Sequence, residues 1–183
     1  AGAMVAAVAI PAILSIPALR GDGPRDERPI VPLDRLLLPR PATGLPGDPA
    51  WSLYGTWQMD GRPRDNLARQ WSGNGDDARL AQTVQRYATA ADAHRAYLGS
   101  GPIARAAGQA ESSAVPGSVP DGVDADTSVV GCVGGRPPEC HVWIYWARYG
   151  QYNVSLSSAN VDSRVPYDTF AAHVLDVDRT MTS

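Results

Sequence analysis

The chain has 183 residues, with 16 basic and 19 acidic side chains that give a net charge of −3 at pH 7. Hydrophobic residues make up 44% of it and charged residues 19%, so we expect a folded core and not wholesale disorder. The acidic balance and the lack of any basic run argue against nucleic acid as a partner. Every basic residue is Arg, a bias typical of GC-rich genomes such as those of actinobacteria.

Residues 1–19 carry no charged side chain, and Arg20 is the first group that requires water. As a helix this segment would extend about 28 Å, close to the hydrocarbon thickness of a bilayer. We interpret it as a transmembrane or signal-anchor helix, through which the chain contacts the membrane. Two alternatives stay open, namely the hydrophobic part of a secretion signal and a buried helix.

Residues 20–50 are rich in Pro, at a density incompatible with helix and sheet interiors. They are predicted to form a Pro-rich linker, or strap, within which the apolar run 36–38 lies down on the globular body. Residues 51–183 then form one extracytoplasmic α+β domain.

Hydrophobic periodicity predicts the element order β, β, α, β, β, β, α after the linker. The predicted elements are strands at 51–59 and 79–87, a helix at 89–98 with a resumption after Gly101-Pro102 to about 107, strands at 127–133, 141–149 and 151–158, and a helix at 166–181. For 79–87 a helix is the alternative, because Leu80, Val84 and Tyr87 also fit a helical face. Loops are expected at 62–77 and 111–126. This order predicts an α+β fold with an antiparallel sheet of about five strands and helices packed on one face.

The two cysteines, Cys132 and Cys140, enclose a turn-forming run flanked by β-rich sequence. A hairpin would bring their sulfurs within bonding reach, so we predict a disulfide. That bond would place the domain in an oxidising space outside the cytoplasm. A metal site that adds His141 is the alternative, but the C-x7-C-H spacing matches no common zinc pattern. We expect no metal and no cofactor.

The strand at 141–149 is apolar on both faces. Alternation places Val142, Ile144 and Trp146 on one face and Trp143, Tyr145 and Ala147 on the other. The next strand is polar on one of these faces, so something must cover the second face of 141–149. The strap, the segment 51–57, or a ligand or partner protein could do so. We take Trp143, Tyr145 and Tyr152 as candidate ligand- or partner-binding residues.

No catalytic residue is assigned, since no Gly-x-Ser-x-Gly or similar nucleophile motif occurs. His94 and His173 fall in predicted amphipathic helices, where a solvated or capped imidazole is expected, and His141 is interpreted as structural. The loop acids do not follow the order of a calcium loop, so a solvated acidic turn is expected. These acids are Asp121, Asp124 and Asp126.

The layout resembles that of a known group of protein domains. The resemblance rests on the run Val-Gln-Arg-Tyr-Ala-Thr-Ala-Ala-Asp-Ala-His-Arg-Ala-Tyr at 84–97, the strands over 127–149 and 151–158, and the closing helix at 166–181. They are similar to extracytoplasmic sensor-like domains of actinobacterial membrane proteins and lipoproteins. This group includes the external domain of PknH-type receptor kinases and the broader PsbP-like α+β domains. The resemblance implies an α+β domain that binds ligands or partners outside the cell.

Together these features predict a single-pass protein of the cell membrane whose C-terminal domain lies outside the cytoplasm. The domain is expected to bind or sense a protein or small ligand without catalysis. One alternative is an accessory subunit of a larger membrane protein complex, whose external domain caps partner subunits. A small secreted hydrolase is a third hypothesis.

Overall fold

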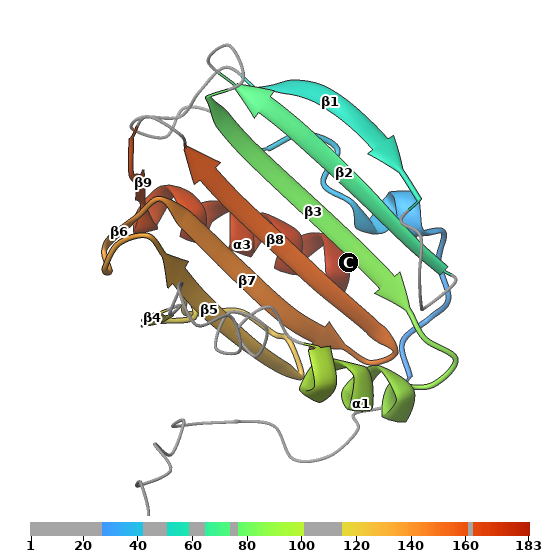
Figure 1. Cartoon of the computed structure of the whole chain (residues 1–183). Helices are drawn as coiled ribbons and strands as arrows, with labels where there is room; N and C mark the ends of the chain where they lie inside the picture. The colour runs from blue at the N-terminus through green and yellow to red at the C-terminus, as the bar shows by residue number, and fades with distance from the viewer. Residues whose placement is uncertain (1–26, 42–50, 59–64, 74–76, 101–114, 161–162) are drawn as a thin grey trace, which may run out of the picture.

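The computed structural model describes residues 27–41, 51–58, 65–73, 77–100, 115–160 and 163–183. Within these residues a seven-stranded antiparallel sheet carries two helices, which confirms the α+β class (Figure 1). The sheet order is β1-β2-β3-β8-β7-β5-β4, and β6 and β9 form a separate pair. The strands are β1 (Ser52–Trp57), β2 (Asp65–Gly73), β3 (Ala78–Arg86), β4 (Val115–Gly117), β5 (Thr127–Val133), β6 (Glu139–Cys140), β7 (Val142–Tyr149), β8 (Tyr152–Asn160) and β9 (Val165–Pro166). The helices are α1 (Ala90–Ser100), α3 (Tyr167–Thr182) and the short 3-10 turn η1 (Leu33–Leu36).

The predicted number of strands in the sheet is wrong, because two of its strands lie in segments predicted to be loops. β2 falls within 62–77 and pairs with β3 along its whole length, and β4 falls within 111–126. In β2, Trp71 is buried and Leu67 is half-buried on the same face of the sheet. Arg69 lies between them on that face, so the apolar pattern of the strand is interrupted in the sequence.

The centre of the sheet is the pairing of β3 with β8 over nine residue pairs. Leu80 and Val84 of β3 and Val154 and Leu156 of β8 are fully buried on one face of this pair. This face of the sheet therefore forms one side of the hydrophobic core, and we call it the core face.

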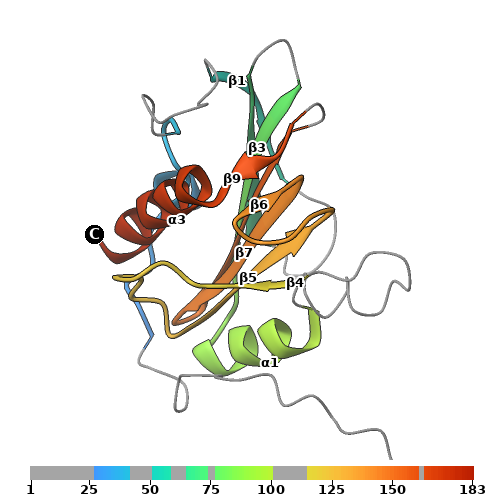
Figure 2. The same cartoon turned by 90° about the vertical axis from the view of Figure 1, so that its left-hand side faces the viewer.

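Helix α3 covers this core face (Figure 2). Phe170, Val174 and Val177 recur at helical spacing and are fully buried, as the periodicity predicts. His173 lies in the same stripe and is also fully buried, with its ring edge-on to Trp51 at 6.0 Å between ring centroids. The expectation of a solvated imidazole at His173 is therefore wrong.

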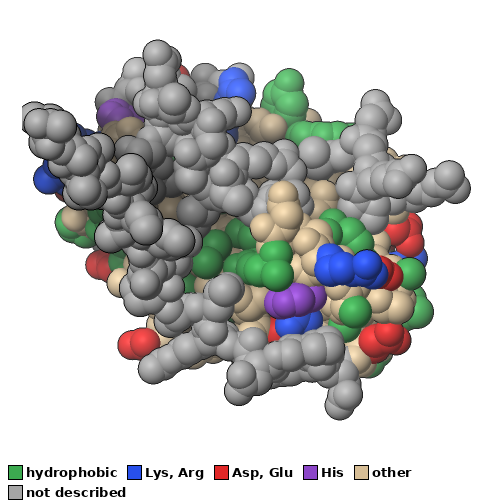
Figure 3. Space-filling model, turned by 60° about the horizontal axis from the view of Figure 1, so that its bottom comes forward, with side chains coloured by type: hydrophobic (Ala, Val, Ile, Leu, Met, Phe, Trp, Pro, Cys, Tyr) green, Lys and Arg blue, Asp and Glu red, His purple; other side chains and the backbone are tan. Residues whose placement is uncertain are grey.

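Helix α1 lies on the opposite face of the sheet, so the prediction that both helices share one face is also wrong. The ring of Tyr97 stacks on Trp146 with centroids 6.0 Å apart, and Asn153 donates a hydrogen bond to the Ala93 carbonyl at 3.0 Å. The physical reason is the two-sided apolar character of β7, which requires cover on both faces. At this end of the molecule the described hydrophobic, acidic and basic side chains are interspersed (Figure 3).

Residues 27–41, which we call the docked segment, pack beside α3 on the core face. Leu36, Leu37 and Leu38 are buried, as the sequence predicts. The segment contains four Pro and does not join the sheet. Its backbone groups therefore need partners other than a β-ladder.

Side chains of the body supply these partners, and three of them, Gln82, Gln151 and Tyr152, each both donate to and accept from the segment backbone. Gln82 accepts from the Leu38 N–H at 2.7 Å and donates to the Leu36 carbonyl at 3.0 Å. Gln151 does the same with the Arg28 backbone, at 2.7 and 2.6 Å. The Tyr152 hydroxyl donates to the Pro29 carbonyl at 3.1 Å and accepts from the Val31 N–H at 3.2 Å.

Arg28 ties the start of the docked segment to the end of α3. Its guanidinium donates to the Met181 carbonyl at 3.0 Å and lies 5.1 Å from the centre of the Tyr149 ring. A cation is stabilised at a helix C-terminus by the helix dipole, and over an aromatic ring by the ring quadrupole. One side chain thus joins the segment, α3 and β7.

Neither helix of the described residues is long and apolar enough to cross a bilayer. The predicted membrane helix at 1–19 lies outside the described residues.

We expect the substitution Gln82→Ala to lower the free energy of unfolding by about 2 to 4 kcal/mol, because it leaves a buried N–H and a buried carbonyl without their partner. Urea unfolding followed by tryptophan fluorescence measures this change. Gln70→Ala is the matched control, since Gln70 is half-buried on the other face of the sheet, and should stay within about 0.5 kcal/mol of the wild type. Equal effects of the two substitutions would contradict the role given to Gln82.

Candidate functional site: a polar hollow beside the docked segment

A hollow of about 280 Å³ lies where the docked segment passes the start of β2 and the end of β3. Residues 32–34, Gln58, residues 65–67 and Arg86 line it. The antiparallel pairing of Asp65 with Arg86 determines its position, because it brings the carboxylate at the start of β2 beside the guanidinium at the end of β3. The docked segment supplies the facing wall.

An ion pair stands in the wall of the hollow. The Arg86 Nε donates to Asp65 Oδ2 at 3.0 Å, and a second guanidinium nitrogen contacts the same oxygen. The hydrogen bond that Arg86 donates to Asp65 raises the pKa of Arg86 above its usual value, and the Tyr152 hydroxyl adds a smaller effect in the same direction. The cation is thus fixed in place at the junction of segment and sheet.

The lining combines charge with a small apolar surface. Asp34 and Asp65 supply carboxylates, Arg86 supplies a guanidinium, and Leu33 and Leu67 supply half-buried apolar surface. Ligand pockets for drug-sized molecules span roughly 300 to 1,000 Å³. The hollow therefore suits a small polar group, such as one side chain of a peptide or a small polar molecule.

The structure places the predicted binding residues inside the core. Trp143 is fully buried, stacks on Phe170 with centroids 5.6 Å apart, and donates its indole N–H to the Val165 carbonyl at 2.8 Å. Tyr145 is fully buried, and Tyr152 holds the docked segment as described above. A binding role for these three residues stays a prediction, and the hollow does not include them.

Tyr145 belongs to a buried chain of hydrogen bonds. The Tyr145 and Tyr149 hydroxyls lie 2.8 Å apart, and the Tyr149 hydroxyl donates to Asp178 Oδ1 at 2.8 Å. The same carboxylate oxygen accepts from the Asp124 N–H at 2.9 Å. Burial raises the pKa of both tyrosines above the usual value. The chain fixes α3 to β7 from within the core.

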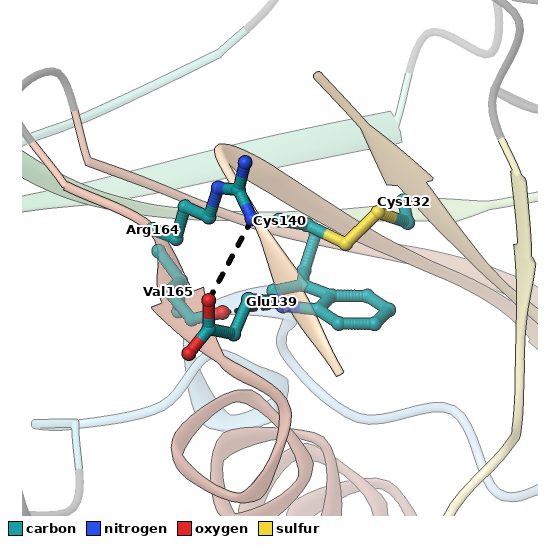
Figure 4. Close-up of a disulfide and its surroundings, with 6 residues drawn as sticks. Cys132, Glu139, Cys140, Arg164 and Val165 are labelled. Carbon is teal, nitrogen blue, oxygen red and sulfur yellow. Dashed lines mark hydrogen bonds and ion pairs between the residues drawn. A yellow bond between two sulfur atoms is a disulfide. The ribbon is translucent and has the colours of Figure 1, made fainter. Parts of the chain in front are cut away.

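Cys132 and Cys140 form the predicted disulfide, with their Cα atoms 5.6 Å apart (Figure 4). Gly134, in the loop between them, has a φ of 71°, a left-handed conformation that favours Gly. Arg164 and Glu139 lie beside the bond as an exposed ion pair at 3.6 Å. The pairing of β6 with β9 connects this hairpin to the start of α3.

The expected solvated acidic turn is wrong for Asp126. Its carboxylate is buried, forms an ion pair with the buried Arg148 at 3.0 Å, and accepts from the Gly150 N–H at 2.6 Å. Among the other candidates, His94 is half-buried and His141 is exposed. No group of three or more metal-ligating side chains occurs in the part of the chain that the structure describes.

Comparison of the chain with protein-family models, curated proteins and solved structures finds no match. The resemblance to extracytoplasmic sensor-like domains therefore stays a prediction.

Sequence reasoning missed the hollow because β2 was predicted to be a loop. Asp65 and Arg86 become cross-strand neighbours only when β2 pairs with β3 in the observed register. The alternation of Leu67 and Trp71 is the signal that could have revealed this strand.

We expect removal of the disulfide, by reduction or by Cys132→Ala with Cys140→Ala, to lower the free energy of unfolding by about 2 to 3 kcal/mol. The bond closes a short loop, with a sequence separation of 8, and such a loop restricts the unfolded chain to this extent. Urea unfolding with and without reductant measures the change. Reductant should have no effect on the double variant, and an unchanged wild type in reductant would refute the prediction.

We expect stability to fall as the pH rises above about 10, where the unfolded tyrosines ionise while Tyr145 and Tyr149 are held protonated in the fold. Below about pH 10 this contribution is fully present. Tyr149→Phe should reduce the slope of unfolding free energy against pH by up to about 1.4 kcal/mol per pH unit in that range. A Tyr149→Phe slope equal to that of the wild type would count against the assignment.

Proposed function

We propose that this chain is a membrane-anchored extracytoplasmic domain that binds or senses a partner or small ligand and is not an enzyme. Residues 1–19 anchor it in the cell membrane in a single pass, and the folded body lies outside the cytoplasm. The disulfide between Cys132 and Cys140 is the observation that carries this proposal. Structural disulfides persist in oxidising compartments and are rare in the cytoplasm.

The polar hollow supports the binding part of the proposal. Its walls come from the docked segment and from two strands that are themselves fixed in a long ladder. The ion pair of Arg86 with Asp65 keeps charged groups in place before any ligand arrives. A preformed site of this kind loses little conformational entropy on binding.

An accessory subunit of a larger membrane protein complex is the second candidate, and β1 favours it. This strand lies at an edge of the sheet and exposes Leu53, Tyr54 and Trp57. Exposed apolar side chains on an edge strand are typical of a surface that another protein covers.

Location is tested by fusing alkaline phosphatase, which needs its own disulfides to be active, to Ser183 of the full chain in a bacterial host. We expect an active, membrane-bound fusion, because the body crosses the membrane behind residues 1–19. Deletion of residues 1–19 is the control and should give an inactive fusion in the cytosol. An inactive full-length fusion would rule out the proposed location.

Purification from native membranes in mild detergent separates the two candidates. A subunit would migrate with other proteins at a fixed stoichiometry, whereas a sensor-like domain would not. Arg86→Gln should weaken capture of a ligand or peptide held in the hollow and leave a subunit contact through β1 intact.

A further inference from the structure

Helices α1 and α3 bury very different amounts of apolar side chain. Among the described side chains of α1, those of Ala90, Ala93 and Tyr97 are buried, and two of these three are only methyl groups. Leu98 of the same helix is 51% exposed. Helix α3, by contrast, buries a stripe of large side chains, namely Phe170, Val174, Val177 and Met181. The free energy gained on burial scales with the apolar area removed from water, so α1 is attached to the sheet much more weakly than α3.

Several polar atoms where α1 meets the sheet lack a hydrogen-bond partner in the part of the chain that the structure describes. They are the indole N–H of Trp146, the side-chain oxygen of Asn153 and the Nδ1 of His94. Trp146 and Asn153 are 6% and 0% exposed, and both contact α1, through Tyr97 and the Ala93 carbonyl. A polar group that is buried without a partner gives up its hydrogen bonds to water and lowers the stability of the arrangement that buries it. These atoms therefore disfavour the docked position of α1.

The contacts that stabilise α1 as a helix lie within the helix and its cap. Thr89 accepts from the Asp92 N–H at 3.1 Å, the hydrogen bond of an N-cap, and Asp92 forms an ion pair with Arg95. Neither contact involves the sheet. Just before the cap, the Tyr87 N–H donates to the Gln151 carbonyl at 2.9 Å and fixes the chain to the body. Residues 88–89 therefore join a fixed strand end to a helix that carries its own cap.

We propose that α1 is a cover that detaches from the sheet while the rest of the domain stays folded, with residues 88–89 as the hinge. A hinge of this kind absorbs the change in backbone angles at a few residues that end an element. Detachment exposes the ring of Trp146 and the side chain of Asn153, and water then bonds the indole N–H and the amide oxygen. This face of the sheet thus changes from one that α1 closes to one that presents an aromatic ring and hydrogen-bonding groups. The core face, which α3 covers, stays closed.

Hydrogen exchange of the full chain in detergent, measured by mass spectrometry, tests this proposal. A helix of 11 residues is marginal on its own, so the amides of α1 lose protection when it detaches. We expect them to exchange about a hundredfold faster than the amides of residues 170–177 in α3. Tyr97→Ala removes the ring that stacks on Trp146 and should speed exchange in α1 by about tenfold more, with exchange in α3 unchanged. Leu98→Ala is the matched control, because that side chain is exposed, and should stay within about twofold of the wild type.

Covalent labelling of tryptophan with a nitrobenzyl bromide reagent shows whether the helix leaves the sheet or frays in place. Trp143 is the reference, since it is fully buried on the core face. We expect Trp146 to be labelled about tenfold faster than Trp143, and faster still in Tyr97→Ala.

Two results would overturn the proposal. Exchange in wild-type α1 as slow as in α3 would mean that both helices open only when the whole domain unfolds. Rapid exchange in α1 with Trp146 labelled no faster than Trp143 would mean that α1 frays without detaching. Neither measurement depends on the side of the membrane on which the body lies, so both are independent of the alkaline phosphatase result.

Discussion

The docked segment imposes the constraint on which the rest of the structure depends. Its Pro residues keep it out of the sheet, yet its leucines are buried, so its backbone polar groups need partners inside the fold. Gln82, Gln151 and Tyr152 supply these partners, because each side chain donates one hydrogen bond to the segment backbone and accepts another from it, as a residue of a neighbouring strand would. Because Gln82 belongs to β3, Tyr152 begins β8 and Gln151 lies in the turn just before it, the pairing of those two strands fixes where the segment lies.

The same arrangement determines what each face of the sheet can do. The core face is closed by α3 and the docked segment, and the buried chain from Tyr145 through Tyr149 to Asp178 locks the helix to β7. The other face receives α1 at one end, where Tyr97 covers Trp146. The surface that is left for contact with other molecules includes the hollow beside the segment and the free edge at β1.

The parts of the fold that could be predicted are those whose pattern is local. β7, β8 and α3 show clear periodicity, and the disulfide follows from two cysteines at the ends of a turn-forming run. The strand β2 could not be predicted, because charged and amide side chains are interspersed with its apolar residues. The hollow and the partners of the docked segment depend on contacts such as Gln151 with Arg28, 123 positions apart, and periodicity carries no signal of these. The burial of Asp126 likewise depends on Arg148 from another strand.

The anchoring of the docked segment has a mechanical consequence. A force applied at its N-terminal end reaches the body through Arg28 and Gln151, at the turn that leads into β8. β8 is bonded to β3 on one side and to β7 on the other, along nearly its whole length. The contact of Gln151 with Arg28 therefore attaches the docked segment beside a central strand that is hydrogen-bonded on both sides, and not beside an edge strand. A body tethered from this end would be held through the interior of its sheet.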